Sequence, residues 1–207
     1  MKVAVVGGTG PFGRALTLRL RDAGHEVTIG SRSARRAREV AEALGVSGAA
    51  NTDAVDGTDV VVLAVNADAV LDTARELAAA IDDRTVLSVA SELRFSREGV
   101  YPGPDEISLA ERIAGIVSGP VVSGLHSLAA HTLGEGEPPE QDALICGDDE
   151  EAKRVVLELA GGLVRGRAVD AGPLAGARAL EGLTAVIVNI NRRYRAHAGL
   201  RVTGLRR

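Results

Sequence analysis

The chain has 207 residues, a formal net charge of −4 and only 2% aromatic residues. The acidic balance and the scarcity of aromatic rings argue against nucleic-acid binding, and the net charge argues against an anionic membrane surface. Because Cys146 is the only cysteine, an internal disulfide is excluded, while 45% hydrophobic residues suffice for a compact core.

Short apolar runs bounded by Gly, Asp or Pro alternate with longer amphipathic segments along the chain. That alternation is typical of βαβ units, whose parallel strands are buried on both faces and read as continuous apolar runs. The runs predict strands at Lys2–Val6, Glu26–Ile29, Asp59–Val65, Thr85–Ser88, Pro120–Gly124, Ala143–Cys146 and Arg167–Asp170.

Helices are predicted between these strands, over Gly10–Ala23, Ala34–Leu44, Ala67–Ala80, Leu109–Ile116, Glu150–Ala160 and Gly172–Arg195. The stretches Arg94–Ser108 and Thr132–Glu140 are rich in Gly and Pro and are predicted to be loops. We therefore expect an α/β protein: a Rossmann-type, doubly wound, mostly parallel sheet in residues 1–131, followed by a small C-terminal helical or αβ domain in residues 132–207.

The start of the chain indicates where the protein resides. The apolar run Val3–Val6 is too short for the core of a signal peptide, and no stretch approaches the roughly 20 apolar residues of a membrane span. We therefore expect a cytoplasmic protein with no membrane or nucleic-acid partner. The four histidines do not show metal-ligand spacing, so no metal is expected.

A glycine-rich turn joins the first predicted strand to the first predicted helix. Residues Gly8-Thr9-Gly10-Pro11-Phe12-Gly13 match G-x-G-x-x-G. In such a turn Gly8 permits the tight bend, Gly10 lets the backbone approach a pyrophosphate, and Gly13 lets the helix pack against the strand. Free N–H groups at the helix start then hold the phosphates. The turn predicts a dinucleotide site.

The end of the second predicted strand indicates which dinucleotide is preferred. A protein that prefers NAD usually places Asp or Glu there, whereas this chain has Ser31 and Arg32, with Arg36 one turn further on. A carboxylate would repel a 2′-phosphate, while hydroxyl and guanidinium groups complement it. The sequence therefore predicts NADP(H). Arg35 is interpreted as part of a solvated helix face.

Six short segments, spread over nearly the whole chain, together carry a resemblance to a known family. They are Gly7-Gly8-Thr9-Gly10, Gly30-Ser31-Arg32, Gly124-Leu125-His126, Cys146-Gly147-Asp148-Asp149, Asp170-Ala171-Gly172-Pro173-Leu174 and Glu181-Gly182-Leu183-Thr184. With these segments the chain resembles the NADPH-dependent coenzyme F420 reductases, also called F420:NADP oxidoreductases. The resemblance implies a Rossmann domain with a small C-terminal domain, a homodimer, and an oxidoreductase that passes hydride between NADP(H) and the deazaflavin coenzyme F420.

The resemblance also implies roles for individual residues. Thr9, Gly10, Pro11 and Phe12 would hold the pyrophosphate, and Ser31, Arg32 and Arg36 the 2′-phosphate. Val65, Asn66 and Ala67 would flank the adenosine and ribose, while Ser91 and Ala130 would line the nicotinamide. The F420 pocket would contain His126, Ser127, Leu128 and, from the tail, Leu200. No residue is expected to be catalytic, because hydride transfer between two rings needs close stacking rather than a protein acid or base.

Some segments depart from the family pattern. Ser88-Val89-Ala90-Ser91-Glu92 stands where the family is proline-rich, and Ser127-Leu128-Ala129 stands where Thr-Ile-Pro is usual. The second-cofactor side is therefore altered, which leaves two alternatives: an NADPH-dependent reductase of another small substrate or flavin, and a non-catalytic NADP(H)-binding redox sensor. A carbonyl or imine reductase generally needs a proton donor such as Lys, and neither Lys2 nor Lys153 lies at a predicted strand end. Glu181 is interpreted as a surface or pairing charge.

Overall fold

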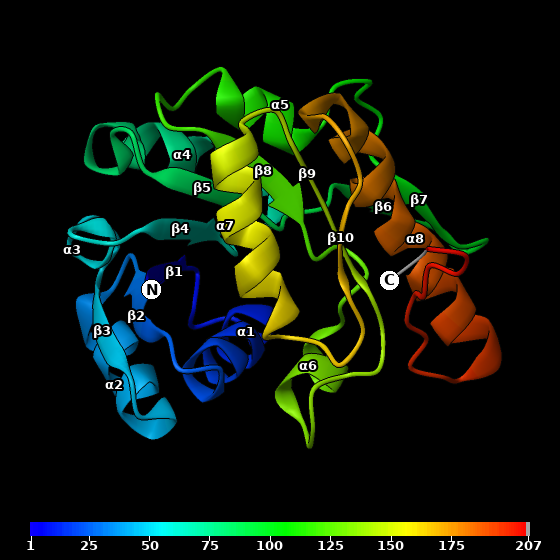
Figure 1. The fold of residues 1–207 in the computed structure, drawn as a ribbon, viewed down its shortest axis with the longest axis horizontal. Helices are drawn as coiled ribbons and strands as arrows, with labels where there is room; N and C mark the ends of the chain where they lie inside the picture. The colour runs from blue at the N-terminus through cyan, green and yellow to red at the C-terminus, as the bar shows by residue number, and fades with distance from the viewer. Residues whose placement is uncertain (206–207) are drawn as a thin grey trace.

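The computed structural model describes residues 1–205, which surround one eight-stranded sheet (Figure 1). In space the strands follow the order β10-β9-β8-β5-β4-β1-β2-β3. Their bounds are β1 Lys2–Val6, β2 Glu26–Ser31, β3 Ser47–Ala50, β4 Val60–Leu63, β5 Thr85–Ser88, β8 Val121–Gly124, β9 Ala143–Gly147 and β10 Ala168–Asp170.

The sheet is parallel except where β9 runs antiparallel to β8. β1 pairs with β2 on one side and with β4 on the other, so the strand order reverses between β1 and β4. The α/β, mostly parallel Rossmann-type fold is therefore confirmed. In such sheets ligands bind beyond the carboxyl ends of the strands at the reversal, which places the candidate site after β1 and β4.

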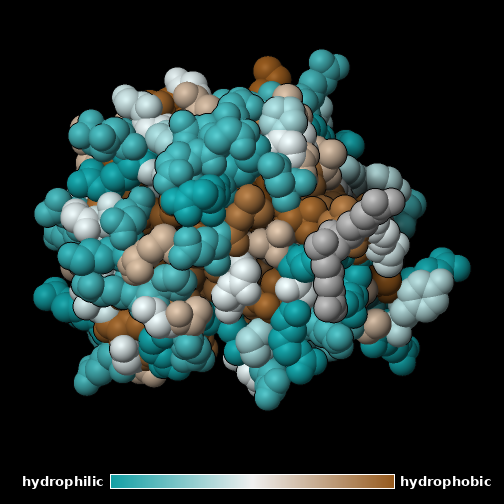
Figure 2. All heavy atoms as spheres, in the orientation of Figure 1, coloured by the Kyte–Doolittle hydropathy of each residue, from teal (hydrophilic) through white to brown (hydrophobic). Residues whose placement is uncertain are grey.

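The helices cover both faces of the sheet. Their bounds are α1 Pro11–Asp22, α2 Ala34–Leu44, α3 Asn51–Val55, α4 Ala67–Ile81, α5 Leu109–Ala114, α6 Ala130–Gly134, α7 Glu150–Gly161 and α8 Ala177–Tyr194, with a 3₁₀ turn η1 at Leu174–Gly176. Leu16 of α1 and Val156 of α7 share one apolar core, whereas Leu77 of α4 and Ile113 of α5 belong to the core on the opposite face. The outer helix faces are mostly hydrophilic, with apolar atoms seen between α7 and α8 (Figure 2).

The two predicted loops contain ordered elements. Arg94–Ser108 includes most of a hairpin, β6 (Leu93–Phe95) with β7 (Val100–Pro102), and the second loop begins inside α6. The hairpin is held from outside: the side chain of Asn189 on α8 accepts the Val100 N–H at 2.8 Å and donates to the Val100 carbonyl at 2.7 Å. Local sequence does not reveal such a long-range partner.

Other predicted bounds were wrong for local reasons. The last helix starts at Ala177 instead of Gly172, because Gly172 has φ +95° and a 3₁₀ turn intervenes. The β3 and α3 elements were missed, since the β3 sequence Ser-Gly-Ala-Ala lacks the apolar run of a buried strand. A Cβ on Gly48 would lie 2.5 Å from the Ala37 carbonyl oxygen, so β3 packs tightly against α2.

The C-terminal segment continues the same sheet. β9 and β10 extend it beyond β8, and α8 packs back beside β7 (Figure 1). The division into residues 1–131 and 132–207 stays a prediction. Among the helices of residues 1–205, none combines the length and the apolar character needed to cross a membrane.

Candidate functional site

The glycine turn after β1 is shaped by its backbone. Gly7 has φ +84°, so the left-handed residue is Gly7 and not Gly8 as the motif suggested. A Cβ on Gly8 would lie 2.8 Å from the Val5 carbonyl oxygen, which makes Gly8 a close-packing position. The Gly7 N–H donates to the Gly30 carbonyl at 3.1 Å and ties the turn to β2.

Gly10 and Gly13 have different tasks in the same turn. A Cβ on Gly13 would approach the Gly7 carbonyl oxygen to 2.5 Å, so α1 can pack here only without a side chain. At Gly10 the nearest atom would be 3.4 Å away and φ is an ordinary −79°. Gly10 is thus free of internal crowding and lines an open cleft. The amides of Phe12 and Gly13 lie in the first turn of α1, where no intrahelical acceptor exists.

An outer cleft of about 770 Å³ runs from this turn to the end of β2. Ser31, Arg32 and Arg36 line it, as the sequence predicted, and Ser33 caps α2 by accepting the Arg36 N–H at 3.3 Å. Among residues 1–205, no carboxylate forms an ion pair with Arg32 or Arg36. Arg35 instead pairs with Glu39 at 2.8 Å on an exposed helix face.

The opposite wall of the outer cleft comes from β4 and α4. Val65 and Asn66 line it as predicted. Three carboxylates of α4 also face it, and the motif gave no sign of them: Asp68, Asp72 and Glu76. Asn51, at the start of the missed helix α3, is a further lining residue whose buried Oδ1 has no hydrogen-bond partner.

An inner cavity of about 270 Å³ adjoins the outer cleft, because Ala64, Val65 and Asn66 line both. Its wall is mainly apolar, with hydroxyl and imidazole groups on one side. The remaining lining residues are Phe12, Ala67, Val89, Ala90, Ser91, Leu93, Leu125, His126, Leu128 and Thr184. His126 and Leu128 were predicted in the second-cofactor pocket and Ser91 beside the nicotinamide, whereas Thr184 comes from α8 and carried no predicted role.

Three side chains that line the inner cavity, Ser91, His126 and Thr184, form one hydrogen-bonded chain with the buried Ser123. The His126 ring lies between Ser123 Oγ, 2.9 Å from Nε2, and Ser91 Oγ, 3.1 Å from Nδ1. Ser91 Oγ is 2.8 Å from Thr184 Oγ1, which donates to the His126 carbonyl at 2.9 Å.

The hydrogen bond from Thr184 to the His126 carbonyl determines which group donates at every other contact of the chain. Since the Thr184 proton goes to the His126 carbonyl, Ser91 donates to Thr184 and accepts from His126 Nδ1–H, while Ser123 donates to Nε2. His126 is thus a neutral Nδ1–H tautomer.

Burial keeps His126 neutral. The side chain is 7% exposed, and desolvation lowers its pKa to about 4. Both ring nitrogens are already engaged by hydroxyls, so the imidazole orients Ser91 and leaves no free ring N–H for a bound molecule. Leu125, just before it, has φ +67°, a conformation that a branched side chain adopts only under constraint.

Six predicted residues line neither cavity: Gly8 and Gly13, which pack within the turn, Pro11 at the start of α1, and Ser127, Ala130 and Leu200 further along the chain. Ser127 and Ala130 follow His126 in the chain but line neither cavity. Leu200 lies in the tail, where its carbonyl accepts the Asp142 N–H at 2.7 Å. Buried Asp142 also accepts the Val202 N–H at 2.8 Å, so the tail is fastened beside β9. Within residues 1–205 no cluster of three or more His, Cys, Asp or Glu side chains could hold a metal.

Comparison with known proteins gives this pair of cavities its context. The family model described as NADP oxidoreductase, coenzyme F420-dependent, matches residues 2–92. The F420-dependent NADP reductase of Methanocaldococcus jannaschii is 32% identical, with 99% of both chains covered. That of Methanothermobacter thermautotrophicus is 35% identical over 99% of this chain and 96% of the other. The chain belongs to the F420-dependent NADP reductase family.

A solved structure extends the family likeness to three dimensions. A protein from Arthrobacter sp. FB24, provisionally assigned as an F420-dependent NADP reductase, is 25% identical and superimposes with a TM-score of 0.86. The comparison covers 99% of this chain and 100% of that one. Family membership therefore includes β9, β10 and α8, beyond the segment that the family model matches.

Proposed function

We propose that the protein is an oxidoreductase that transfers hydride between NADP(H) and coenzyme F420, with the dinucleotide in the outer cleft and the deazaflavin ring in the inner cavity. The observation that carries the proposal is that the two cavities share Ala64, Val65 and Asn66 at the carboxyl edge of the sheet. A nicotinamide at this junction would lie against whatever ring fills the inner cavity.

The outer cleft fits NADP(H) by its backbone and its charges. Gly10 leaves space for a pyrophosphate, and the first amides of α1 supply donors together with the positive end of the helix dipole. Ser31, Arg32 and Arg36 are available to a 2′-phosphate. The acidic wall of α4 lies across the cleft from these arginines and is unsuited to phosphate.

The inner cavity fits a planar, largely uncharged ring. The nicotinamide and deazaflavin supply the hydride chemistry when both are bound. The protein's part is to stack and orient the rings: apolar residues such as Leu125 and Leu128 exclude water, and the hydroxyl chain fixes polar contacts at one edge. His126 holds Ser91 in place and stays neutral at physiological pH.

Reduction of a small imine or keto acid is less well supported. Among the described lining residues of the inner cavity there is no Lys, Asp or Glu, and the single titratable group there is His126. Its pKa of about 4 makes it a poor proton donor at neutral pH. A non-catalytic redox sensor would use the same outer cleft but would have no need for an ordered second cavity.

We further propose a homodimer formed through the outer face of α8. Val186, Ile190 and Tyr194 recur every four residues along that face and are exposed. The neighbouring hairpin adds Phe95 and Tyr101, so three of the four Phe and Tyr residues of this chain are exposed on α8 and the hairpin. Exposed apolar patches of this kind mark interfaces. A cytoplasmic location is also proposed, in keeping with the free, buried Cys146.

The test is an anaerobic assay with purified protein, NADPH and oxidised F420, following loss of the deazaflavin absorbance, with FMN and NADH as controls. NADPH-dependent bleaching over many turnovers is expected. Tight NADPH binding without bleaching would contradict the proposal and favour the sensor. For the homodimer, Ile190→Glu should convert a dimer to a monomer in light scattering, and a monomeric wild-type protein would disprove it.

A further inference from the structure

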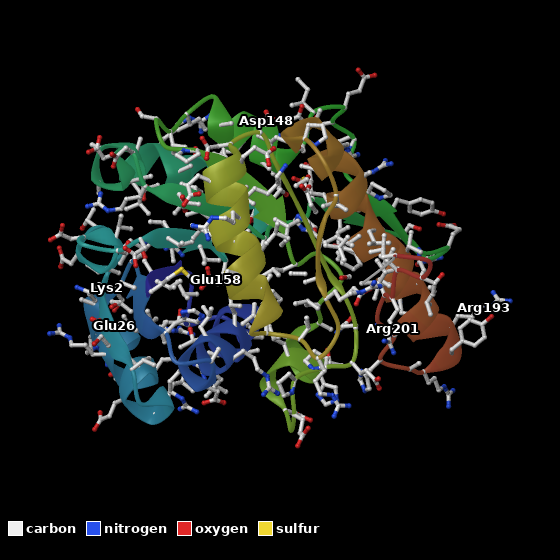
Figure 3. All side chains as sticks on the ribbon, in the orientation of Figure 1. Lys2, Glu26, Asp148, Glu158, Arg193 and Arg201 are labelled. Carbon is white, nitrogen blue, oxygen red and sulfur yellow. The ribbon has the colours of Figure 1, made fainter. Side chains whose placement is uncertain are left out.

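Polar side chains along α8 each fasten a different segment of the protein. Arg178 donates to the carbonyls of Gly103 and Asp105, Thr184 donates to His126, and Asn189 bonds Val100. Glu181 is the buried acid in this series: it is 2% exposed, so of the two interpretations, surface charge or pairing charge, the first was wrong. The helix runs from η1, whose first N–H is held by Asp148, to Arg193 near its far end (Figure 3).

Glu181 completes the N-terminus of α5. Its two carboxylate oxygens accept the N–H groups of Leu109 at 3.1 Å and Ala110 at 3.2 Å. The first N–H groups of a helix have no partner within the helix. Here Ser108 and Glu111 satisfy each other in a capping box, so the two remaining amides depend on Glu181. The carboxylate thereby clamps α8 to α5.

The clamp lies close to the inner cavity. Thr184 follows Glu181 by three residues, which is nearly one helical turn and about 4.5 Å along the axis. Thr184 Oγ1 contacts both Ser91 and the His126 carbonyl, so a slide or rotation of α8 would break the hydroxyl chain. On its other side α8 is held by Asn189, which fastens the hairpin and not the cavity.

We infer that Glu181 is a positioning residue for the inner cavity: as a carboxylate bound to the first two amides of α5, it sets the place of Thr184 and so the geometry of the Ser91–His126 chain. The consequence for hydride transfer rests on the proposed function, whereas the link between Glu181 and Thr184 does not.

The charge state of Glu181 gives the inference a second line of support. Burial raises its pKa to about 7, against the opposing effects of the α5 amides and of Arg178. The other ionisable groups near it are Glu111 on α5 and the buried thiol of Cys146 on β9. Protonation leaves one carboxyl oxygen as a hydroxyl, which accepts poorly from an amide, so the clamp weakens as the pH falls below about 7.

The decisive experiment compares Glu181→Gln with the wild type and with Glu158→Gln, a matched change of an exposed carboxylate on α7 (Figure 3). Glutamine keeps the size of the side chain and is neutral at every pH. In an NMR titration of the NADPH-bound protein, the Thr184 methyl resonance should shift with an apparent pKa near 7 in the wild type and in Glu158→Gln, but not in Glu181→Gln. A shift that persists in Glu181→Gln, or none in the wild type, would overturn the inference.

Kinetics add a test of the consequence. At pH 8, kcat for F420 reduction should fall about 5- to 10-fold in Glu181→Gln while NADPH affinity stays unchanged, because only a charge-assisted contact behind the cavity is weakened. The loss should disappear in a Thr184→Val background, since Glu181 acts through that residue. Equal losses in both backgrounds would contradict the inference. If the wild type fails to bleach F420, only the proposed function fails, and the NMR titration still decides the role of Glu181.

Discussion

The outer cleft and the inner cavity are built by different means. The phosphate side of the outer cleft takes its shape from one short stretch, where β1 turns into α1, and its positive charge from residues just beyond β2. The inner cavity joins Ser91, His126 and Thr184 from three distant segments, and these side chains, with Ser123, satisfy one another. The first is shaped by backbone, and the second is a network of partly buried side chains around the buried His126.

This contrast has a physical consequence for substitutions. In the outer cleft the binding groups are largely independent, so each change should remove its own contact and leave the fold intact. In the inner cavity the hydroxyls of Ser91 and Thr184 each donate and accept, so removal of either leaves a partner unsatisfied. Changes there should therefore affect stability and chemistry together.

The largest effect is expected at the glycine turn. Gly10→Leu should weaken NADPH binding by at least about 100-fold without lowering the melting temperature, because the backbone tolerates a side chain there and the cleft does not. Gly13→Leu should instead destabilise the protein by about 3 kcal/mol or more through overpacking against Gly7. Fluorescence titration and thermal unfolding measure both. Unchanged NADPH affinity in Gly10→Leu would mean that phosphate binds elsewhere.

Next in size is the 2′-phosphate contact. Arg32→Ala should weaken NADPH by about 10- to 100-fold, the value of a charged hydrogen bond, while NADH binding changes less than about 2-fold. Arg35→Ala is the matched control, since its side chain is exposed and paired with Glu39. Equal losses for both dinucleotides would remove Arg32 from the selectivity site.

A smaller effect is expected in the inner cavity. Ser91→Ala deprives His126 Nδ1–H of its acceptor and should lower the free energy of unfolding by about 1–3 kcal/mol. It should also lower kcat more than NADPH affinity. Ser118→Ala, at an exposed loop position before β8, is the control. Urea unfolding and steady-state kinetics measure both quantities, and full stability in Ser91→Ala would argue against the hydroxyl chain.

The smallest effects are pH slopes of opposite sign. The pKa of His126 is lowered to about 4, so its contribution to stability is full above about 6.5 and is lost as the pH falls towards 4. Burial raises the pKa of Glu181 to about 7 and outweighs the α5 amides, so the free energy of unfolding falls as the pH rises from about 4.5 towards 7, even though the charged carboxylate binds those amides more tightly.

The two contributions oppose each other between about pH 4.5 and 6.5, and the variants separate them. Between pH 5 and 6.5, the difference in free energy of unfolding between the wild type and His126→Asn should increase with pH. The difference between the wild type and Glu181→Gln should decrease over the same range. Each slope is at most about 1.4 kcal/mol per pH unit. Parallel curves for the wild type and both variants would contradict the burial of these groups.

The same contrast explains how much the sequence could predict. Gly8, Gly10 and Gly13 lie within six residues, and Ser31 and Arg32 end a recognisable strand, so the outer cleft is a local pattern. His126 was expected near the second cofactor because it ends a strand, and it does line the inner cavity.

What the sequence could not show are the partners across long separations. Thr184 lies 93 residues from Ser91 in the sequence. No local pattern in the residues of α8 indicates that this helix contacts that serine. The tail shows the same difficulty: Leu200 was expected at the second cofactor, whereas Asp142 holds its backbone beside β9. β3 was missed because its residues are small, and the hairpin was predicted as a loop because its partner, Asn189, lies on the distant helix α8.

The position of α8 near the end of the chain affects how the molecule is made. Ribosomal synthesis runs from the N-terminus, so every residue of the outer cleft leaves the ribosome before the helix that carries Glu181 and Thr184. The nascent protein thus acquires its dinucleotide cradle first and closes its second cavity last. A chain cut short before α8 would retain every residue of the proposed NADPH cleft and lack Thr184 and Glu181.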